Sequence, residues 1–321
     1  MRFDVIIGNP PYQENDGGGM GSSAIPIYNK FIEQAIRLNP RHLSFIIPAR
    51  WYTGGKGLNS FREKMLSSGK IKEIHDYVDS KECFSNVDIK GGVCYFLMDM
   101  DYTGDCKVVV HKDSIIVSSV LRNLIEFGSD IFIRNNEDAL IINKVTSMSL
   151  EKFSKIVSTR NPFGLISSFN EYKEEYSEDY PIKLYTVNGQ GWISRDTVKN
   201  NVDYIDKYKV LIPKAWGDGI PSKDRIKPIL AKPGSCCTET YLLVGPFESK
   251  KQAENCMSFI RTGFLHFLVS VKKNTQNAAR GVYDFVPLVD FDTAWDDDKL
   301  FKEFNLINEE IKHIRETVNC N

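Results

Sequence analysis

The sequence predicts an α/β fold: a partial sheet of four strands, the last one antiparallel, followed by a second, α+β domain. Within the first hundred residues, short apolar runs alternate with segments of helical periodicity. No helical segment separates the third apolar run from the fourth, so the last strand should pair antiparallel with the one before it. Further along the chain, short strands and turns replace this alternation.

The expected elements of the first domain follow from these patterns in order. Apolar side chains recur at helical spacing over residues 27–38, which predicts a helix, and a shorter helix over residues 61–68 should end at Gly69. Strands alternating with helices imply right-handed crossovers and a mainly parallel sheet. The four expected strands occupy residues 3–8, 42–49, 71–78 and 91–100.

The chain should divide into a first domain over residues 1–115, a connecting segment over 116–155 and a second domain over 156–321. The connecting segment should contain a helix at 135–153, because apolar residues recur there at helical spacing. The second domain should combine strands at 182–194, 208–217 and 239–247 with a long helical stretch at 250–271 and a final helix at 300–318.

Composition favours a cytoplasmic protein with no membrane span and no structural metal. No apolar run approaches the roughly 20 residues that span a bilayer. The seven cysteines are odd in number and form no CxxC pair, and the five histidines are scattered. The net charge of −1 does not by itself indicate a nucleic-acid partner. Acidic clusters such as 171–180 and 290–299 would, however, cancel the charge of a basic groove elsewhere in the net total. The simpler interpretation of both clusters is solvated surface.

The tetrapeptide Asn9-Pro10-Pro11-Tyr12 directly follows the first strand. Two prolines make a stiff, extended turn at the strand's C-terminal end, where open α/β sheets bind ligands. The Asn9 side-chain oxygen and the Pro10 carbonyl are two acceptors that could grip an exocyclic amine, whose lone pair is otherwise delocalised into its aromatic ring. The prolines fix the Pro10 carbonyl in advance, and Tyr12 offers a stacking face for a planar base. A plain rigid turn is the alternative interpretation.

The strand followed by NPPY resembles the catalytic motif of S-adenosylmethionine-dependent adenine-N6 methyltransferases. Residues 1 to about 110 resemble, more closely, the adenine DNA methylases of restriction-modification systems, in the order of strand, NPPY, helix, strand and later aromatic. The resemblance implies a partial Rossmann-like methyltransferase sheet, with residues 1–115 as its catalytic half. It also implies duplex DNA as the partner, a base flipped from the helix, and Asn9, Pro10, Pro11 and Tyr12 as catalytic residues.

By the same resemblance, Phe84 occupies the place of a second aromatic that packs against the flipped adenine. Tyr77 and Phe61 are also candidates for that place, and Phe84 could equally be an ordinary core aromatic. The glycine-rich stretch at 16–23 lacks the lysine and spacing of a phosphate-binding loop. It suits a loop that closes over the base or DNA, or a flexible linker.

The large second domain suits a target-recognition module that reads DNA. Two segments, 209–228 and 270–285, combine basic residues for phosphates with amides that can read adenine edges. Ordinary surface loops share this composition. The candidate DNA contacts are Lys214, Lys223, Arg225, Lys272, Lys273, Asn274, Gln276 and Arg280.

In the family, a glycine-rich turn for the cofactor and an acidic residue for its ribose normally precede NPPY. The expectation is therefore a site for S-adenosylmethionine that lies largely outside this chain, on a missing N-terminal half or a partner subunit. A cognate nuclease is a further possible partner, but no carboxylate-lysine cluster predicts cleavage by this chain. The alternatives are a non-catalytic DNA-recognition piece and an RNA or protein N-methyltransferase, because enzymes of those kinds share the motif.

Overall fold

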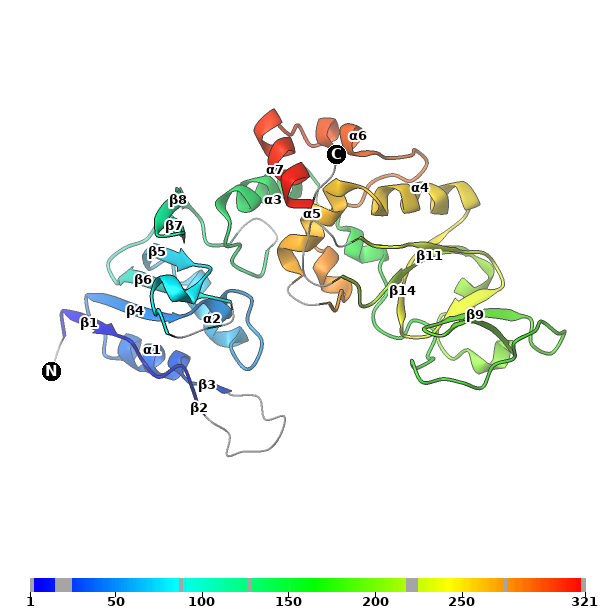
Figure 1. Ribbon diagram of the computed structural model, residues 1–321, viewed down its shortest axis with the longest axis horizontal. Helices are drawn as coiled ribbons and strands as arrows, with labels where there is room; N and C mark the ends of the chain where they lie inside the picture. Colours follow the sequence, from blue (N-terminus) through cyan, green and yellow to red (C-terminus); the bar gives the residue numbers. More distant parts are fainter. Residues whose placement is uncertain are drawn as a thin grey trace. The chain divides into compact units, whose positions relative to one another are not determined.

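The structure is a computed structural model that describes residues 3–14, 25–86, 89, 91–125, 129–149, 151–217, 225–273 and 276–318. The chain forms two compact units, Met1–Leu140 and Ile141–Asn321. Each unit has its own sheets and helices (Figure 1). Among the described residues, no helix is both long and apolar enough to cross a membrane.

The first unit is built on one six-stranded sheet with the order β1-β4-β6-β5-β7-β8. A separate two-stranded ribbon, β2 with β3, lies just after the NPPY turn. The strands are β1 (Val5–Gly8), β2 (Gln13–Glu14), β3 (Ile25–Pro26), β4 (His42–Pro48), β5 (Ile71–Tyr77), β6 (Val93–Asp99), β7 (Cys106–Lys112) and β8 (Ile115–Arg122). The helices are α1 (Tyr28–Arg37) and α2 (Asn59–Ser67), with 3-10 turns η1 (Ala49–Tyr52) and η2 (Ser80–Glu82).

An α/β fold and the antiparallel pairing of β5 with β6 are confirmed. The expectation of a mainly parallel sheet is wrong, because three of the five strand pairings in this sheet are antiparallel. β6 lies inside the sheet, antiparallel to β4 on its other side, while β1 and β4 are parallel. The expected count of four strands is wrong, because β7 and β8 extend the sheet beyond β5. These two strands form a hairpin around Asp113 and Ser114, both at positive φ, so the sheet continues past residue 115.

One face of this sheet carries the core of the unit. Along β4, Leu43, Phe45 and Ile47 are buried and join a cluster with residues of α1 and α2, whereas the intervening side chains are only half-buried. This alternation is what a sheet with helices on one side requires. β1 is the outermost strand on one side of the sheet, and its Val5 and Ile7 are 54% and 76% exposed.

The second unit contains two three-stranded sheets, β10-β9-β13 and β12-β11-β14. Helix α3 joins the two units, since the boundary between them falls inside it. The strands are β9 (Ile182–Thr186), β10 (Gly189–Ile193), β11 (Tyr208–Pro213), β12 (Ile229–Ala231), β13 (Ser235–Cys237) and β14 (Tyr241–Phe247). The helices are α3 (Asn136–Met148), α4 (Lys250–Ile260), α5 (Gly263–Lys272), α6 (Asp297–Glu303) and α7 (Asn308–Val318). Four 3-10 turns complete the unit: η3 (Phe153–Ile156), η4 (Arg195–Thr197), η5 (Val202–Asp206) and η6 (Arg280–Tyr283).

Two expected helices are each divided in the structure. The stretch at 250–271 breaks at Thr262, whose side chain accepts a hydrogen bond from the Leu265 amide and so caps α5. The final stretch divides into α6 and α7 around Asn305, which adopts a positive φ of 50°. Helical periodicity continues across both breaks, which is why the sequence pattern alone did not separate the helices.

Candidate active site

The NPPY turn leaves the sheet at the end where four strands, β1, β4, β5 and β7, finish. Strands β1 and β4 are parallel, and β5 runs in the same direction because both β4 and β5 are antiparallel to β6. The segments after Gly8, Pro48 and Tyr77 therefore start from one edge of the sheet. This carboxyl edge is where ligands bind in open α/β sheets.

Within the turn, the residues differ in exposure. Asn9 and Pro11 are exposed, Pro10 is buried and Tyr12 is half-buried. The Tyr12 carbonyl accepts a hydrogen bond from the Ile27 amide at 3.2 Å, which ties the turn to the chain entering α1. The fixed backbone of the prolines therefore sits between a strand and a hydrogen-bonded anchor.

Tyr12 and Phe84 lie together at this edge, although they are far apart in sequence. Their ring centroids are 6.4 Å apart, with an angle of 68° between the ring planes. The Tyr12 hydroxyl is buried without a hydrogen-bond partner among the described residues, and burial raises its pKa to about 12. Tyr12 is therefore a neutral phenol at physiological pH, with its ring beside that of Phe84.

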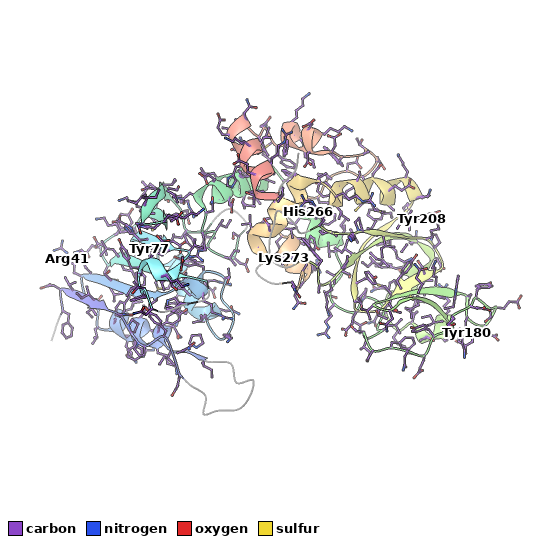
Figure 2. All side chains as sticks on the ribbon, in the orientation of Figure 1. Arg41, Tyr77, Tyr180, Tyr208, His266 and Lys273 are labelled. Carbon is purple, nitrogen blue, oxygen red and sulfur yellow. The ribbon has the colours of Figure 1, made fainter. Side chains whose placement is uncertain are left out.

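The other two aromatic candidates lie elsewhere in the unit. Phe61 is 2% exposed and packs against Tyr28 and Trp51 in the core. Tyr77, which is labelled in Figure 2, is half-buried and stacks on His111 with ring centroids 4.2 Å apart. Phe84 is thus the candidate whose ring contacts Tyr12.

The turn η1, which follows β4 at the carboxyl edge, carries two aromatic residues that pack in the core. Trp51 is fully buried, and its indole nitrogen donates to the Cys94 sulfur at 3.5 Å. Tyr52 follows it in η1 and packs against Phe132, with ring centroids 4.5 Å apart. These contacts place Trp51 in the core of the unit.

A buried ion pair, not anticipated from the sequence, lies beneath the segment that carries Phe84. Asp76 is fully buried, and both its oxygens accept hydrogen bonds from Arg134, at 2.9 and 2.8 Å. Burial raises the pKa of the Asp76 carboxyl, while the guanidinium beside it acts in the opposite direction. The available signal was an acidic residue at an apolar, inward-facing position of the strand IKEIHDY.

The described residues contain no group of three side chains arranged to hold a metal ion. The described residues before Asn9 are 3–8, which include the outermost strand β1 and contain no glycine-rich turn that could hold a cofactor. S-adenosylmethionine therefore does not fit these residues alone.

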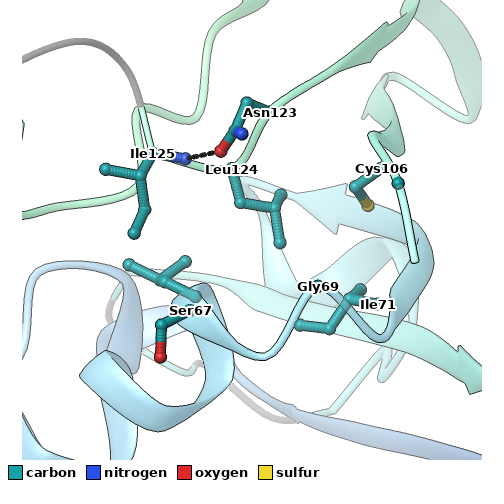
Figure 3. Close-up of a pocket in the computed structure, with 9 residues that line it drawn as sticks. Ser67, Gly69, Ile71, Cys106, Asn123, Leu124 and Ile125 are labelled. Atoms are coloured by element: carbon teal, nitrogen blue, oxygen red, sulfur yellow. Dashed lines mark hydrogen bonds between the residues drawn. The ribbon is translucent and has the colours of Figure 1, made fainter. Parts of the chain in front are cut away.

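A cavity of about 310 Å³ lies at the end of the sheet where β5 and β7 begin, opposite the carboxyl edge (Figure 3). It is bounded by the C-terminal turn of α2 and the first residues of β5 and β7, so it is separate from the NPPY turn. Burial raises the pKa of the Cys106 thiol there to about 12, which makes it a poor nucleophile. The lining residues are Leu66, Ser67, Gly69, Ile71, Gly104, Cys106, Asn123, Leu124 and Ile125.

In the second unit, the two segments chosen as DNA contacts pair with each other. The Gln276 carbonyl accepts from the Trp216 amide at 3.0 Å, and the Lys214 carbonyl accepts from the Ala278 amide at 2.7 Å. Lys214 is half-buried and Gln276 is exposed. Main-chain hydrogen bonds therefore hold the two segments side by side.

Several of the candidate cations make contacts within the unit. Lys272 forms an ion pair with Asp284 at 2.9 Å, and Lys273 lies 4.2 Å from the Trp216 ring centroid with only 8% exposure (Figure 2). Arg225 donates to the Val318 carbonyl, and exposed Arg280 donates to the Ser154 carbonyl at 2.8 Å. Lys223 and Asn274 lie outside the described residues, as does the glycine-rich stretch at 16–23.

Comparisons with known proteins relate part of this chain to methylases. Residues 1–84 match the model of the Eco57I restriction-modification methylase family. An uncharacterized adenine-specific methylase of Mycoplasma pneumoniae is 39% identical over 150 residues, which make up 45% of this chain and 34% of that protein.

Among solved structures, the type IIL restriction-modification enzyme MmeI, in complex with DNA, matches with a TM-score of 0.43 and 11% identity. The match covers 99% of this chain and 55% of that one. The type IIG restriction endonuclease BpuSI matches with a TM-score of 0.37 and 12% identity, covering 98% and 49%. The chain thus spans about a third of the curated relative and about half of each solved structure.

Proposed function

We propose, from the premise that the first unit belongs to the restriction-modification adenine methyltransferases, that this chain holds and methylates the N6 amine of a flipped adenine in DNA. The observation that carries the proposal is the placement of Asn9-Pro10-Pro11-Tyr12 at the carboxyl edge of the sheet, with the Phe84 ring 6.4 Å from that of Tyr12. The match over residues 1–84 supports it, since that range includes both the turn and Phe84.

The chemistry assigned to the turn is positioning of a weak nucleophile. The side-chain oxygen of Asn9 and the carbonyl of Pro10 accept the two amine hydrogens, which draws the nitrogen lone pair out of conjugation with the ring. Since the prolines fix the backbone in advance, these acceptors need little reorganisation when the base arrives. Tyr12 and Phe84 provide ring faces that offset part of the few kcal/mol needed to unstack a base.

S-adenosylmethionine is the proposed methyl donor. Because the described residues do not enclose it, we propose that another polypeptide segment completes its site next to β1. Val5 and Ile7 on that strand are mostly exposed, and the outer edge of β1 has no pairing strand among the described residues. An apolar edge strand of this kind is suited to pairing with a further strand.

The second unit is the proposed target-recognition part. Its paired segments bring the half-buried Lys214 and the exposed Gln276 onto neighbouring stretches of chain. Lysine suits phosphate contacts, and the glutamine amide suits the edge of an adenine in the major groove. Lys272 and Lys273 would need to leave their present partners to reach DNA directly.

The test is a methyl-transfer assay with unmethylated bacterial DNA of mixed sequence, in which N6-methyladenine is measured by mass spectrometry. The chain is assayed alone and together with the polypeptide encoded immediately upstream of it. We expect Asn9→Ala to reduce the rate by about 100- to 1,000-fold, the size of effect seen when one preorganised polar group is removed. Asn188→Ala, in the exposed turn between β9 and β10, is the matched control and should leave the rate unchanged.

Three other outcomes of this assay would contradict part or all of the proposal. DNA binding without methylation, in the presence of the upstream polypeptide, would favour a recognition subunit and refute the enzymatic proposal. Methylation of RNA in preference to DNA would place the chain in a different substrate class. Equal rates for the Asn9 and Asn188 variants would remove the NPPY turn from the mechanism.

A further inference from the structure

The segment between β5 and β6, residues 78–92, carries Phe84 and begins and ends at the carboxyl edge. Its two ends are close together, because an added Cβ on Gly92 would lie 2.1 Å from the Tyr77 carbonyl oxygen and 2.6 Å from that of Val78. Within it, the Phe84 amide donates to the Ser80 carbonyl at 2.8 Å, and the Ser80 hydroxyl accepts from the Ile89 amide at 2.8 Å. We call the described residues of this segment, 78–86, 89, 91 and 92, the Phe84 loop.

Arg134 bridges the two ends of the Phe84 loop. One guanidinium nitrogen donates to the Gly91 carbonyl at 2.5 Å, and another lies 3.4 Å from the Tyr77 carbonyl. The same fork binds both oxygens of Asp76, which is buried on the strand leading into the loop. One side chain therefore reaches the strand before the loop, the start of the loop and its end.

Arg134 belongs to the segment that connects the sheet to α3, and this segment is anchored at the same edge. The Phe132 amide donates to the Tyr52 carbonyl at 3.1 Å, and the Arg134 guanidinium lies 5.5 Å from the Tyr52 ring centroid. A planar guanidinium that makes several hydrogen bonds in fixed directions sets geometry in a way that a lysine ammonium cannot.

We propose that the Asp76–Arg134 pair positions the Phe84 loop, so that it determines how the Phe84 ring meets the base opposite Tyr12. This inference deepens the proposed function and rests on it for the identity of the ligand. Arg134 touches neither the base nor the reacting amine in this account. It acts through Phe84, which makes it a positioning residue.

Removing the Asp76–Arg134 pair would break specific hydrogen bonds at both ends of the Phe84 loop, in addition to any loss of packing. Without the guanidinium, the Gly91 and Tyr77 carbonyls lose a shared donor, and Asp76 is left as a buried carboxylate with no cation. A buried unpaired carboxylate is strongly destabilising, so the single substitution Arg134→Gln could disturb the whole unit. The double variant Asp76→Asn/Arg134→Gln removes both charges and avoids that effect while still releasing the loop.

The first measurement is hydrogen exchange of the full chain without any ligand, read by mass spectrometry. We expect amides of the Phe84 loop to exchange about tenfold faster in the double variant and in Arg134→Lys, with β4 and β7 little changed. Arg122→Gln is the matched control, because the Arg122 guanidinium donates to the Ile133 carbonyl, next to Arg134 in the connecting segment, and to the Asn136 side chain at the start of α3. Faster exchange spread evenly over the sheet, or equal effects of the Arg122 variant, would overturn the proposal.

The second measurement uses a single-stranded oligonucleotide with one 2-aminopurine, whose fluorescence is quenched when the base stacks on aromatic rings. Phe84→Ala and Arg134→Lys should each weaken binding of the oligonucleotide, measured by the quenching of 2-aminopurine fluorescence. For Phe84→Ala, the dissociation constant should rise about tenfold. The combined variant should be no weaker than Phe84→Ala alone, because Arg134 acts through that ring. Additive losses would show that Arg134 serves only general stability.

The two measurements separate the two proposals. If the wild-type chain gives no quenching while the loop still responds to the Arg134 variants, the base-binding function fails and the positioning of the loop stands. If quenching occurs but is insensitive to Arg134, the function stands and the positioning proposal fails.

Discussion

Replacing Gly92 with alanine should destabilise the first unit far more than the same change at its neighbour Gly91. Both glycines have positive φ, 76° at Gly92 and 92° at Gly91. At Gly91 an added Cβ would meet nothing within 4 Å, whereas at Gly92 it would lie 2.1 Å from the Tyr77 carbonyl oxygen. The two positions therefore share the backbone cost and differ in the steric one.

The magnitudes follow from those two contributions. A residue with a Cβ in the left-handed region costs about 1–2 kcal/mol, partly offset by the lower entropy of the unfolded alanine chain, so Gly91→Ala should cost about 1 kcal/mol. At Gly92 the Cβ is over 1 Å inside the ordinary contact distance of roughly 3.3 Å for carbon and oxygen, and the obstacle is backbone. Overpacking of this kind adds about 1–3 kcal/mol, so the total for Gly92→Ala should reach about 3 kcal/mol.

Hydrogen exchange at increasing urea concentration measures this difference unit by unit, through amides of β4 and β6 for the first unit and of β11 and β14 for the second. The second unit should be unaffected by either variant and serves as an internal control. Equal losses for Gly91→Ala and Gly92→Ala would refute the reasoning, because they would mean that the close approach to Tyr77 and Val78 has no energetic consequence.

Three further outcomes are expected. Lys209 is fully buried, its ammonium donates to three backbone carbonyls, and desolvation lowers its pKa from 10.5 to about 8. Because the unfolded state then binds the proton more tightly, stability should rise by up to about 3 kcal/mol between pH 8 and 10.5 relative to Lys209→Met, measured by urea unfolding of both proteins at each pH. Glu239 has its pKa lowered to about 2, chiefly by the hydrogen bond from Arg160. Its contribution to stability is present above about pH 4.5 and should fade as pH falls toward 2, so a thermal melt of Glu239→Gln should show a shallower acid dependence than wild type. Ile7→Lys, at the exposed edge of β1, should change stability by less than about 0.5 kcal/mol and reduce self-association in sedimentation velocity, and an unfolded variant would contradict the edge assignment.

The sequence by itself determined the local features of the first unit. The order of apolar runs gave its first four main-sheet strands, and the missing helix between residues 78 and 91 gave the antiparallel pairing of β5 with β6. The NPPY turn could be placed at the end of β1 because two consecutive prolines lack the amide hydrogens that a strand ladder or a helix interior uses. Each of these inferences depends on a few consecutive residues, so no tertiary information was needed.

Only the tertiary structure decided which distant side chains meet. The contact of Tyr12 with Phe84, and the exclusion of Phe61 and Tyr77 from that place, depend on how segments far apart in sequence leave one edge of the sheet. Asp76 read as one more residue of an alternating strand, and its partner Arg134 lies in a segment with no motif. Side-chain pairing between such segments is set by strand order and register, and the local sequence pattern encodes neither.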